Sequence, residues 1–118
     1  MYSKKVLDHF HNPRNVGEIE NPTAAVEVTN PACGDVLRLS VTVRGGAIVE
    51  VRFKAAGCVP AIACGSWLAD WLMSKPITGL PNLSPQQIEA ALDALPPASK
   101  HAALLASDAL RQLAEKVR

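Results

Sequence analysis

The amino-acid sequence predicts an α+β fold, in which helices pack on a three-stranded antiparallel sheet. Residues 37–44 and 48–54 alternate apolar with polar side chains, which is typical of strands with one buried face. After residue 58 the apolar residues recur at helical spacing instead. Because the strands precede three of the four helices, we expect the helices to cover one sheet within a single domain of residues 1–118.

The chain opens with a short predicted helix. Ser3 can cap its start, and Asn12 should end it, because a residue that precedes proline avoids the helical region. Residues 12–22 are polar and rich in turn formers, so we expect a surface loop there. Three apolar residues share one face of this helix: Val6, Leu7 and Phe10.

The three predicted strands form a meander. Residues 25–29 make the first strand, and a turn at residues 30–35 leads into the second strand at 37–44. Gly45 and Gly46 form a hairpin turn before the third strand at 48–54. The alternation in that strand places Val49, Val51 and Phe53 on one face, and Ile48 on the other with three polar residues: Glu50, Arg52 and Lys54.

Three further helices follow the strands. Residues 59–73 predict an apolar helix that tolerates Pro60 in its first turn. Ser84 should cap the next helix, which we expect to run to about Leu95 before two prolines interrupt it. Residues 98–117 predict the last helix. Four of its residues should face the core: Leu104, Leu105, Ala109 and Leu110.

Composition argues against several classes of function. The net charge of +1 and the aromatic content of 4% argue against a basic nucleic-acid surface and base-stacking platforms. The sequence shows neither an apolar stretch of membrane-spanning length nor an apolar signal segment at its start. Three cysteines are an odd number, which argues for ligands or free thiols in a reducing compartment, so we expect a cytoplasmic protein.

Four residues at the ends of predicted elements form a complete ligand set for zinc or iron. Cys33 and Asp35 lie in the turn before the central strand, Cys58 lies between a strand and a helix, and His101 lies near the start of the last helix. They are too far apart in sequence for a local zinc knuckle, so only the fold could bring them together. We therefore expect a metal or cofactor site made by all four.

Local chemistry supports this interpretation. Cys58 precedes a helix, whose free N–H groups and dipole should lower the pKa of its thiol. The glycines beside Cys33 and Cys58 should let backbone approach the metal and donate hydrogen bonds to sulfur. In an extended segment, Asp35 would point to the same face as Cys33.

Each of these residues also has an ordinary structural explanation. Cys33 and Cys58 could be core residues, His101 a surface residue and Asp35 a turn residue; their joint presence favours a metal. Cys64 shares an apolar stripe with Leu68, which favours a core position over a ligand or sulfur-handling role. The remaining candidates are expected to be structural more often than functional: His9 and His11 near the first helix end, and the core or interface residues Trp67 and Trp71.

Four segments resemble the iron–sulfur cluster assembly scaffolds of the IscU and NifU N-terminal type. They are residues 2–17, residues 30–35 (NPACGD), residues 53–63 (FKAAGCVPAIA) and residues 95–101 (LPPASKH). The resemblance covers the chain in order and implies the SufE/IscU-like α+β sandwich. It also implies a scaffold rather than an enzyme. A cysteine desulfurase would supply sulfur, an iron donor would supply iron, and a transient [2Fe–2S] cluster held by Cys33, Asp35, Cys58 and His101 would pass to apo-acceptor proteins.

Three positions depart from the family pattern. Ala102 stands where the family has a third cysteine directly after the histidine. Ser99 stands where the family has a lysine, with Lys100 one residue later, which weakens the expectation that an Hsp70-type chaperone docks there. Cys64 replaces a small polar residue.

The loss of one thiolate leaves alternatives open. A set of two cysteines, one aspartate and one histidine suits tetrahedral zinc well and a [2Fe–2S] cluster less well, so we expect a labile cluster, bound iron or bound zinc. One alternative is a degenerate zinc- or iron-binding paralogue that docks on the desulfurase through residues 12–17 without building clusters. A zinc hydrolase is disfavoured, because no glutamate stands beside the ligands as a general base.

Overall fold

Three antiparallel strands form the sheet in the order β1-β2-β3, as expected. They are β1 (Ala24–Thr29), β2 (Val36–Arg44) and β3 (Ala47–Ala56) in a computed structural model that describes residues 1–117. The last residue of the predicted domain, Arg118, lies outside the described residues. Val26 pairs with Leu39, and Leu39 pairs with Phe53, so one row of buried apolar side chains crosses the whole sheet.

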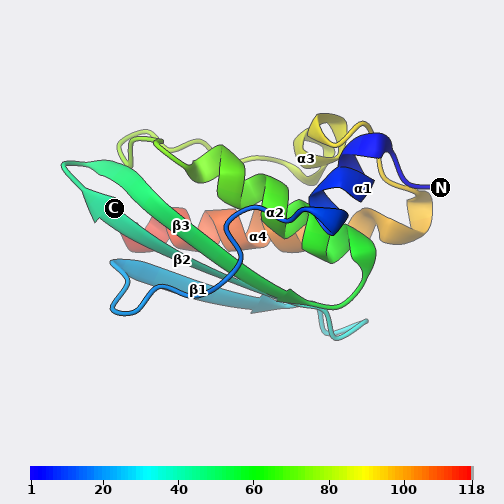
Figure 1. The fold of residues 1–118 in the computed structure, drawn as a ribbon, viewed down its shortest axis with the longest axis horizontal. Helices are drawn as coiled ribbons and strands as arrows, with labels where there is room; N and C mark the ends of the chain where they lie inside the picture. The colour runs from blue at the N-terminus through cyan, green and yellow to red at the C-terminus, as the bar shows by residue number, and fades with distance from the viewer. Residues whose placement is uncertain (118) are drawn as a thin grey trace.

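Helices cover one face of this sheet, which confirms the predicted α+β architecture (Figure 1). The helices are α1 (Lys4–His11), α2 (Val59–Leu72), α3 (Pro85–Ala91) and α4 (Lys100–Val117). α2 packs mainly on β3 and α4 on β1 and β2, while α1 rests on α2 and α3 on α4. Within residues 1–117, no helix combines the length and apolarity that crossing a bilayer requires.

A β-bulge corrects the predicted facing of β3. Thr42 lies opposite Glu50 and Val43 opposite Ile48, so Val49 is an extra residue without a partner on β2. The extra residue reverses the alternation at this point. Ile48 is consequently fully buried and Val49 is 45% exposed, whereas the simple alternation predicted the opposite.

The predicted surface loop at residues 12–22 covers part of the free edge of β3. Phe53 N donates to Asn15 O (2.8 Å), and Gly17 N donates to Phe53 O (2.9 Å). Edge strands left open invite pairing with other chains, so this loop protects the edge next to the residues that lead to Cys58.

The first helix begins as predicted but buries a narrower face. Ser3 Oγ accepts a hydrogen bond from Val6 N (3.1 Å) and donates one to Leu92 O (2.5 Å). Val6 is fully buried, whereas Leu7 is 39% exposed. Because α1 packs mainly on α2, a narrow stripe of it is buried, and the prediction that Leu7 shares this face is wrong.

The last two helices differ from the predictions at their ends. α3 ends at Ala91 rather than near Leu95, because Asp93 and Ala94 adopt left-handed conformations with φ of 59° and 80°. A 3₁₀ turn (Pro97–Ser99) then precedes α4. Leu105, Ala109 and Leu110 face the core as predicted, but Leu104 is 49% exposed.

Candidate metal centre

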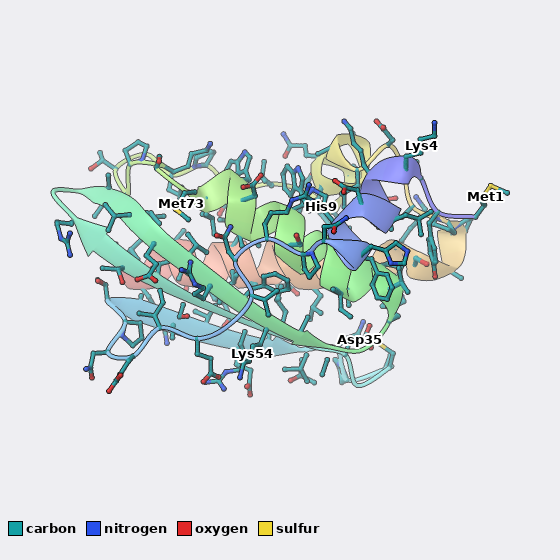
Figure 2. All side chains as sticks on the ribbon, viewed as in Figure 1. Met1, Lys4, His9, Asp35, Lys54 and Met73 are labelled. Atoms are coloured by element: carbon teal, nitrogen blue, oxygen red, sulfur yellow. The ribbon has the colours of Figure 1, made fainter. Side chains whose placement is uncertain are left out.

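The four predicted ligand residues come from three separate parts of the chain and meet at one end of the sheet. Cys33 and Asp35 belong to the turn before β2, Cys58 is the N-cap of α2, and His101 is in the first turn of α4. Figure 2 shows Asp35 at this end, where the turn enters β2 and β3 leads into α2.

The carboxylate of Asp35 lies at the centre of this cluster. Cys58 Sγ donates a hydrogen bond to Asp35 Oδ2 (3.1 Å), and His101 Nε2 lies 3.5 Å from the same oxygen. Cys58 Sγ and His101 Nε2 are 3.7 Å apart. One ligand atom each of Cys33, Asp35 and His101 lies within 4.8 Å of the others. Cys33, Asp35 and His101 thus form a group that could hold one metal ion, and Cys58 lies outside this group but contacts two of its members, Asp35 and His101.

The cluster is open on one side. Asp35 is only 6% exposed, Cys58 and His101 are half-buried, and Cys33 is exposed. A buried carboxylate is costly unless it is hydrogen-bonded or paired, and here its partners are the thiol and the imidazole. The exposed Cys33 thiol thus marks the side from which solvent and other molecules reach the cluster.

The predicted turn at residues 30–35 places both Cys33 and Asp35. Gly34 has a φ of +77°, and its N–H donates to Asn30 O (2.7 Å). Asn30 N in turn donates to Asp35 O (2.8 Å). These two hydrogen bonds close a tight turn, which confirms the turn predicted for residues 30–35, and the side chains of Cys33 and Asp35 come together without an extended backbone.

Gly57 makes room for Asp35, a role that the sequence did not reveal. It has a φ of +145°, and a Cβ built there would overlap the carboxylate of Asp35. Gly34 has open space around it. The sequence predicted that the glycines let the backbone approach the metal. At Gly57 the backbone closely approaches the side chain of Asp35. Only the folded chain brings these two residues together.

The pKa of the Cys58 thiol is raised, which makes the predicted lowering by the helix terminus wrong. Burial is the largest cause, and the hydrogen bond to the Asp35 carboxylate adds to it. The N–H of Ala61, in the first turn of α2, favours the thiolate as predicted, but it is outweighed. Burial and the Asp35 carboxylate together therefore favour the protonated form of the Cys58 thiol.

Cys64 lies in the hydrophobic core, as the apolar stripe predicted. It is 1% exposed, and burial raises the pKa of its thiol to about 12. A thiol that stays protonated and shielded from solvent is a space-filling side chain.

The remaining candidates pack elsewhere. His9 Nδ1 lies 2.8 Å from Ser66 Oγ, and this contact links α1 to α2. Ser66 Oγ accepts a further hydrogen bond from Arg14 N (2.8 Å). Among residues 1–117, neither His9 nor His11 belongs to a metal-binding cluster. Trp67 and Trp71 stack on each other with ring centroids 6.2 Å apart and are partly buried, as the core or interface prediction had it.

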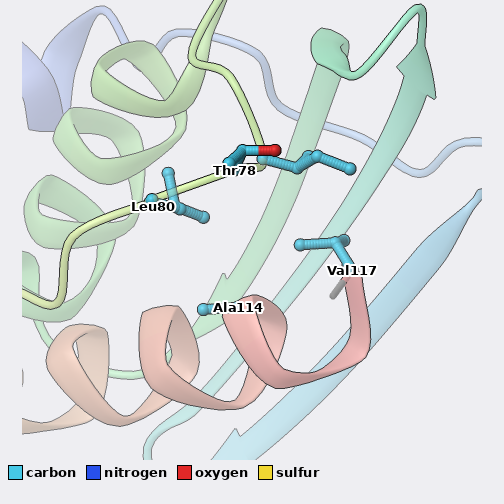
Figure 3. Close-up of a pocket in the computed structure, with 6 residues that line it drawn as sticks. Thr78, Leu80, Ala114 and Val117 are labelled. Atoms are coloured by element: carbon cyan, nitrogen blue, oxygen red, sulfur yellow. The ribbon is translucent and has the colours of Figure 1, made fainter.

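A cavity lies near the opposite end of α4, away from His101. Its volume is about 480 Å³, and Figure 3 shows Thr78, Leu80, Ala114 and Val117 around it. None of the side chains that line it is ionisable or a usual metal ligand. The cavity therefore offers no chemistry to compare with that of the four-residue cluster.

Comparison with known proteins places this geometry in a family. A family model for the NifU-like N-terminal domain matches residues 1–117. The chain is 42% identical over 114 residues to the iron–sulfur cluster assembly scaffold protein IscU of Buchnera aphidicola subsp. Baizongia pistaciae, covering 93% of this chain and 90% of that protein. It is 40% identical over 114 residues to the protein of the same name from Escherichia coli, covering 93% and 88%.

A solved structure supports the fold independently. The putative iron–sulfur cluster assembly scaffold protein for the SUF system from Fervidobacterium islandicum superposes with a TM-score of 0.77 at 20% identity, covering 96% of each chain. That level of identity establishes a shared fold alone. With the family match over residues 1–117 and about 40% identity to the IscU proteins, the chain belongs to the IscU/NifU N-terminal family of iron–sulfur cluster assembly scaffolds.

Proposed function

We propose that the chain is a single scaffold domain on which a [2Fe–2S] cluster is assembled and then transferred. The observation that carries this proposal is the meeting of Cys33, Asp35, Cys58 and His101 at one end of the sheet, in a chain of this family. Two sulfurs, one imidazole and one carboxylate are a donor set suited to iron and zinc. The scaffold holds its cargo and has no catalytic residues of its own.

The four ligands differ in how firmly they are held. Asp35 is buried and fixed by its contacts with Cys58 and His101. Cys33 sits exposed in the turn, so it is the ligand that an incoming or departing group meets first. A pocket with one exposed ligand favours transient binding, which suits a cluster that must leave again.

The other participants follow from this role. A cysteine desulfurase would supply sulfur, an iron donor would supply iron, and apo-acceptor proteins would receive the cluster. The three cysteines are free thiols, which suits a reducing compartment such as the cytoplasm. The loop of residues 12–17, which covers part of the edge of β3, is the surface that we propose for docking of the desulfurase.

Ala102 favours a second candidate function. It follows His101 directly and is 1% exposed, so the pocket has no third thiolate from α4. A set of two thiolates, one histidine and one carboxylate completes a tetrahedral zinc site. In this alternative the chain is a zinc- or iron-binding paralogue that docks on the assembly machinery without building clusters.

Anaerobic reconstitution with ferrous iron and sulfide distinguishes the two functions. A scaffold develops the visible absorption of a [2Fe–2S] cluster, with iron and sulfide in equal amounts by chemical analysis. Cys33→Ala and Cys58→Ala should each abolish this absorption, whereas the matched control Cys64→Ala removes a thiol outside the pocket and should leave it intact. Stoichiometric zinc that resists exchange, with no cluster in the wild-type chain, would reject the scaffold and support the paralogue.

A further inference from the structure

An ion pair between α3 and α4 includes the residue that directly precedes His101. Glu89 on α3 accepts a hydrogen bond from Lys100 Nζ through Oε1 (2.8 Å). The side chain of Glu89 is 10% exposed, whereas that of Lys100 is 59% exposed. Among residues 1–117, no other side chain bonds this carboxylate. The pair joins α3 to the first residue of α4, and the next residue along α4 is His101.

The first turn of α4 lacks the usual stabilising features. The 3₁₀ turn before it has no side-chain cap, and the first turn of α4 holds no acidic residue. It begins instead with Lys100, whose positive charge is unfavourable beside the positive end of the helix dipole. Glu89 supplies from α3 the negative charge that this helix end lacks, and it holds Lys100 in place.

Stability alone does not explain a carboxylate in this position. Desolvation of a buried charge offsets much of the attraction to its partner, so such pairs often fix geometry rather than add stability. Here the geometry that is fixed is the start of α4, and the imidazole of His101 extends from the same turn to within 3.5 Å of Asp35 and 3.7 Å of Cys58.

We propose that Glu89 is a positioning residue for metal binding: through Lys100 it holds the first turn of α4 so that His101 reaches the pocket. This inference rests on the proposed function, because it takes His101 to be a ligand. It assigns to α3 a role in the metal centre, although no residue of α3 belongs to the cluster itself.

Titration with Co²⁺ tests the proposal, because the visible absorption of Co²⁺ reports the identity of its ligands. We expect Glu89→Ala to weaken Co²⁺ binding about tenfold, as loss of a supporting partner typically does, and to shift the spectrum towards that of His101→Ala. The charge swap Glu89→Lys with Lys100→Glu should restore much of the affinity and the wild-type spectrum. Glu18→Gln is the matched control, since it alters an exposed pair with Arg38 (2.6 Å).

The outcomes distinguish a failure of His101 as a ligand from a failure of Glu89 as its positioning residue. If His101→Ala leaves the Co²⁺ spectrum unchanged, His101 is not a ligand, and both the proposed site and this inference fail. If His101→Ala changes the spectrum but Glu89→Ala and the milder Glu89→Gln behave like Glu18→Gln, only the role of Glu89 is overturned. A swapped variant that melts like the wild type but keeps the weak binding of Glu89→Ala also overturns it.

Discussion

Replacement of Gly57 by alanine tests the close approach that shapes the metal centre. The backbone at Gly57 has a φ of +145°, and a Cβ there would overlap the carboxylate of Asp35. Asp35 cannot simply rotate away, because it is 6% exposed and bonded to Cys58. We therefore expect Gly57→Ala to damage both the stability of the chain and the arrangement of its ligands.

The size of the effect follows from two contributions. An alanine at this φ is strained by about 1–3 kcal/mol. The overlap with Asp35 adds about 1–3 kcal/mol, as overpacking in a tight site does. Gly17 has nearly the same backbone, with a φ of +136°, but a Cβ there would be 3.8 Å from its nearest neighbour, which is ordinary contact. Gly17→Ala should therefore show the strain without the overlap.

Urea unfolding and zinc competition measure the two effects. Gly57→Ala should lose about 1–3 kcal/mol more unfolding free energy than Gly17→Ala. Its zinc affinity should fall at least about tenfold, because Asp35 moves out of place, while that of Gly17→Ala stays near the wild-type value. Equal losses of stability in both variants, with unchanged zinc binding in Gly57→Ala, would refute the argument that Gly57 exists to accommodate Asp35.

Three further predictions address the fold. Gly65→Ala would place a Cβ 2.8 Å from the ring of Phe53, so overpacking should outweigh the gain in helix propensity and lower the unfolding free energy by about 1–2 kcal/mol in urea; an unchanged value would contradict this. Burial and nearby Arg14 lower the pKa of His9, so its contribution to the unfolding free energy is complete above pH 6.5 and is lost as the pH falls through the lowered pKa. Urea unfolding of the wild type at a series of pH values should show this fall in the unfolding free energy, and the same fall in His9→Gln would contradict the prediction. Ala94 has a φ of 80°, which strains an alanine, so Ala94→Gly should increase the unfolding free energy by about 0.5–1 kcal/mol and raise the melting temperature. A lower melting temperature would count against strain at this position.

The sheet was predictable because its signal is local. Alternation of apolar and polar residues along residues 37–44 and 48–54 directly reflects one buried face, and the Gly45-Gly46 turn fixes the connection. The bulge at Val49 was not predictable, because it depends on how β3 pairs with β2 rather than on β3 alone. A simple alternation therefore identified the strand but assigned Ile48 to the wrong face.

The C-terminal end of α3 could not be predicted from the sequence either. Asp93 and Ala94 follow Leu92 in left-handed conformations, and Ala94 N donates to Glu89 O (2.7 Å) to close the helix. Glycine or asparagine would have signalled such an end, but alanine rarely adopts this conformation. Nothing in the sequence before Pro96 therefore indicated that the helix ends at Ala91.

The proximity of the four candidate residues was predictable, but their electrostatics were not. Residue type and position at the ends of elements selected Cys33, Asp35, Cys58 and His101, and the fold brings them together. The local argument at Cys58 considered the helix terminus alone and predicted a lowered pKa. Burial and the Asp35 carboxylate, which belong to the tertiary structure, outweigh that effect.

The position of Ala102 links these observations to the chemistry that we propose. It is 1% exposed and belongs to the hydrophobic core, whereas Cys33 is exposed. A thiol at position 102 would therefore be more shielded from solvent than that of Cys33, directly after the proposed ligand His101. Because this thiolate is missing, we expect weaker retention of a cluster here than in a chain that has this cysteine, and Ala102→Cys should slow loss of the cluster absorption.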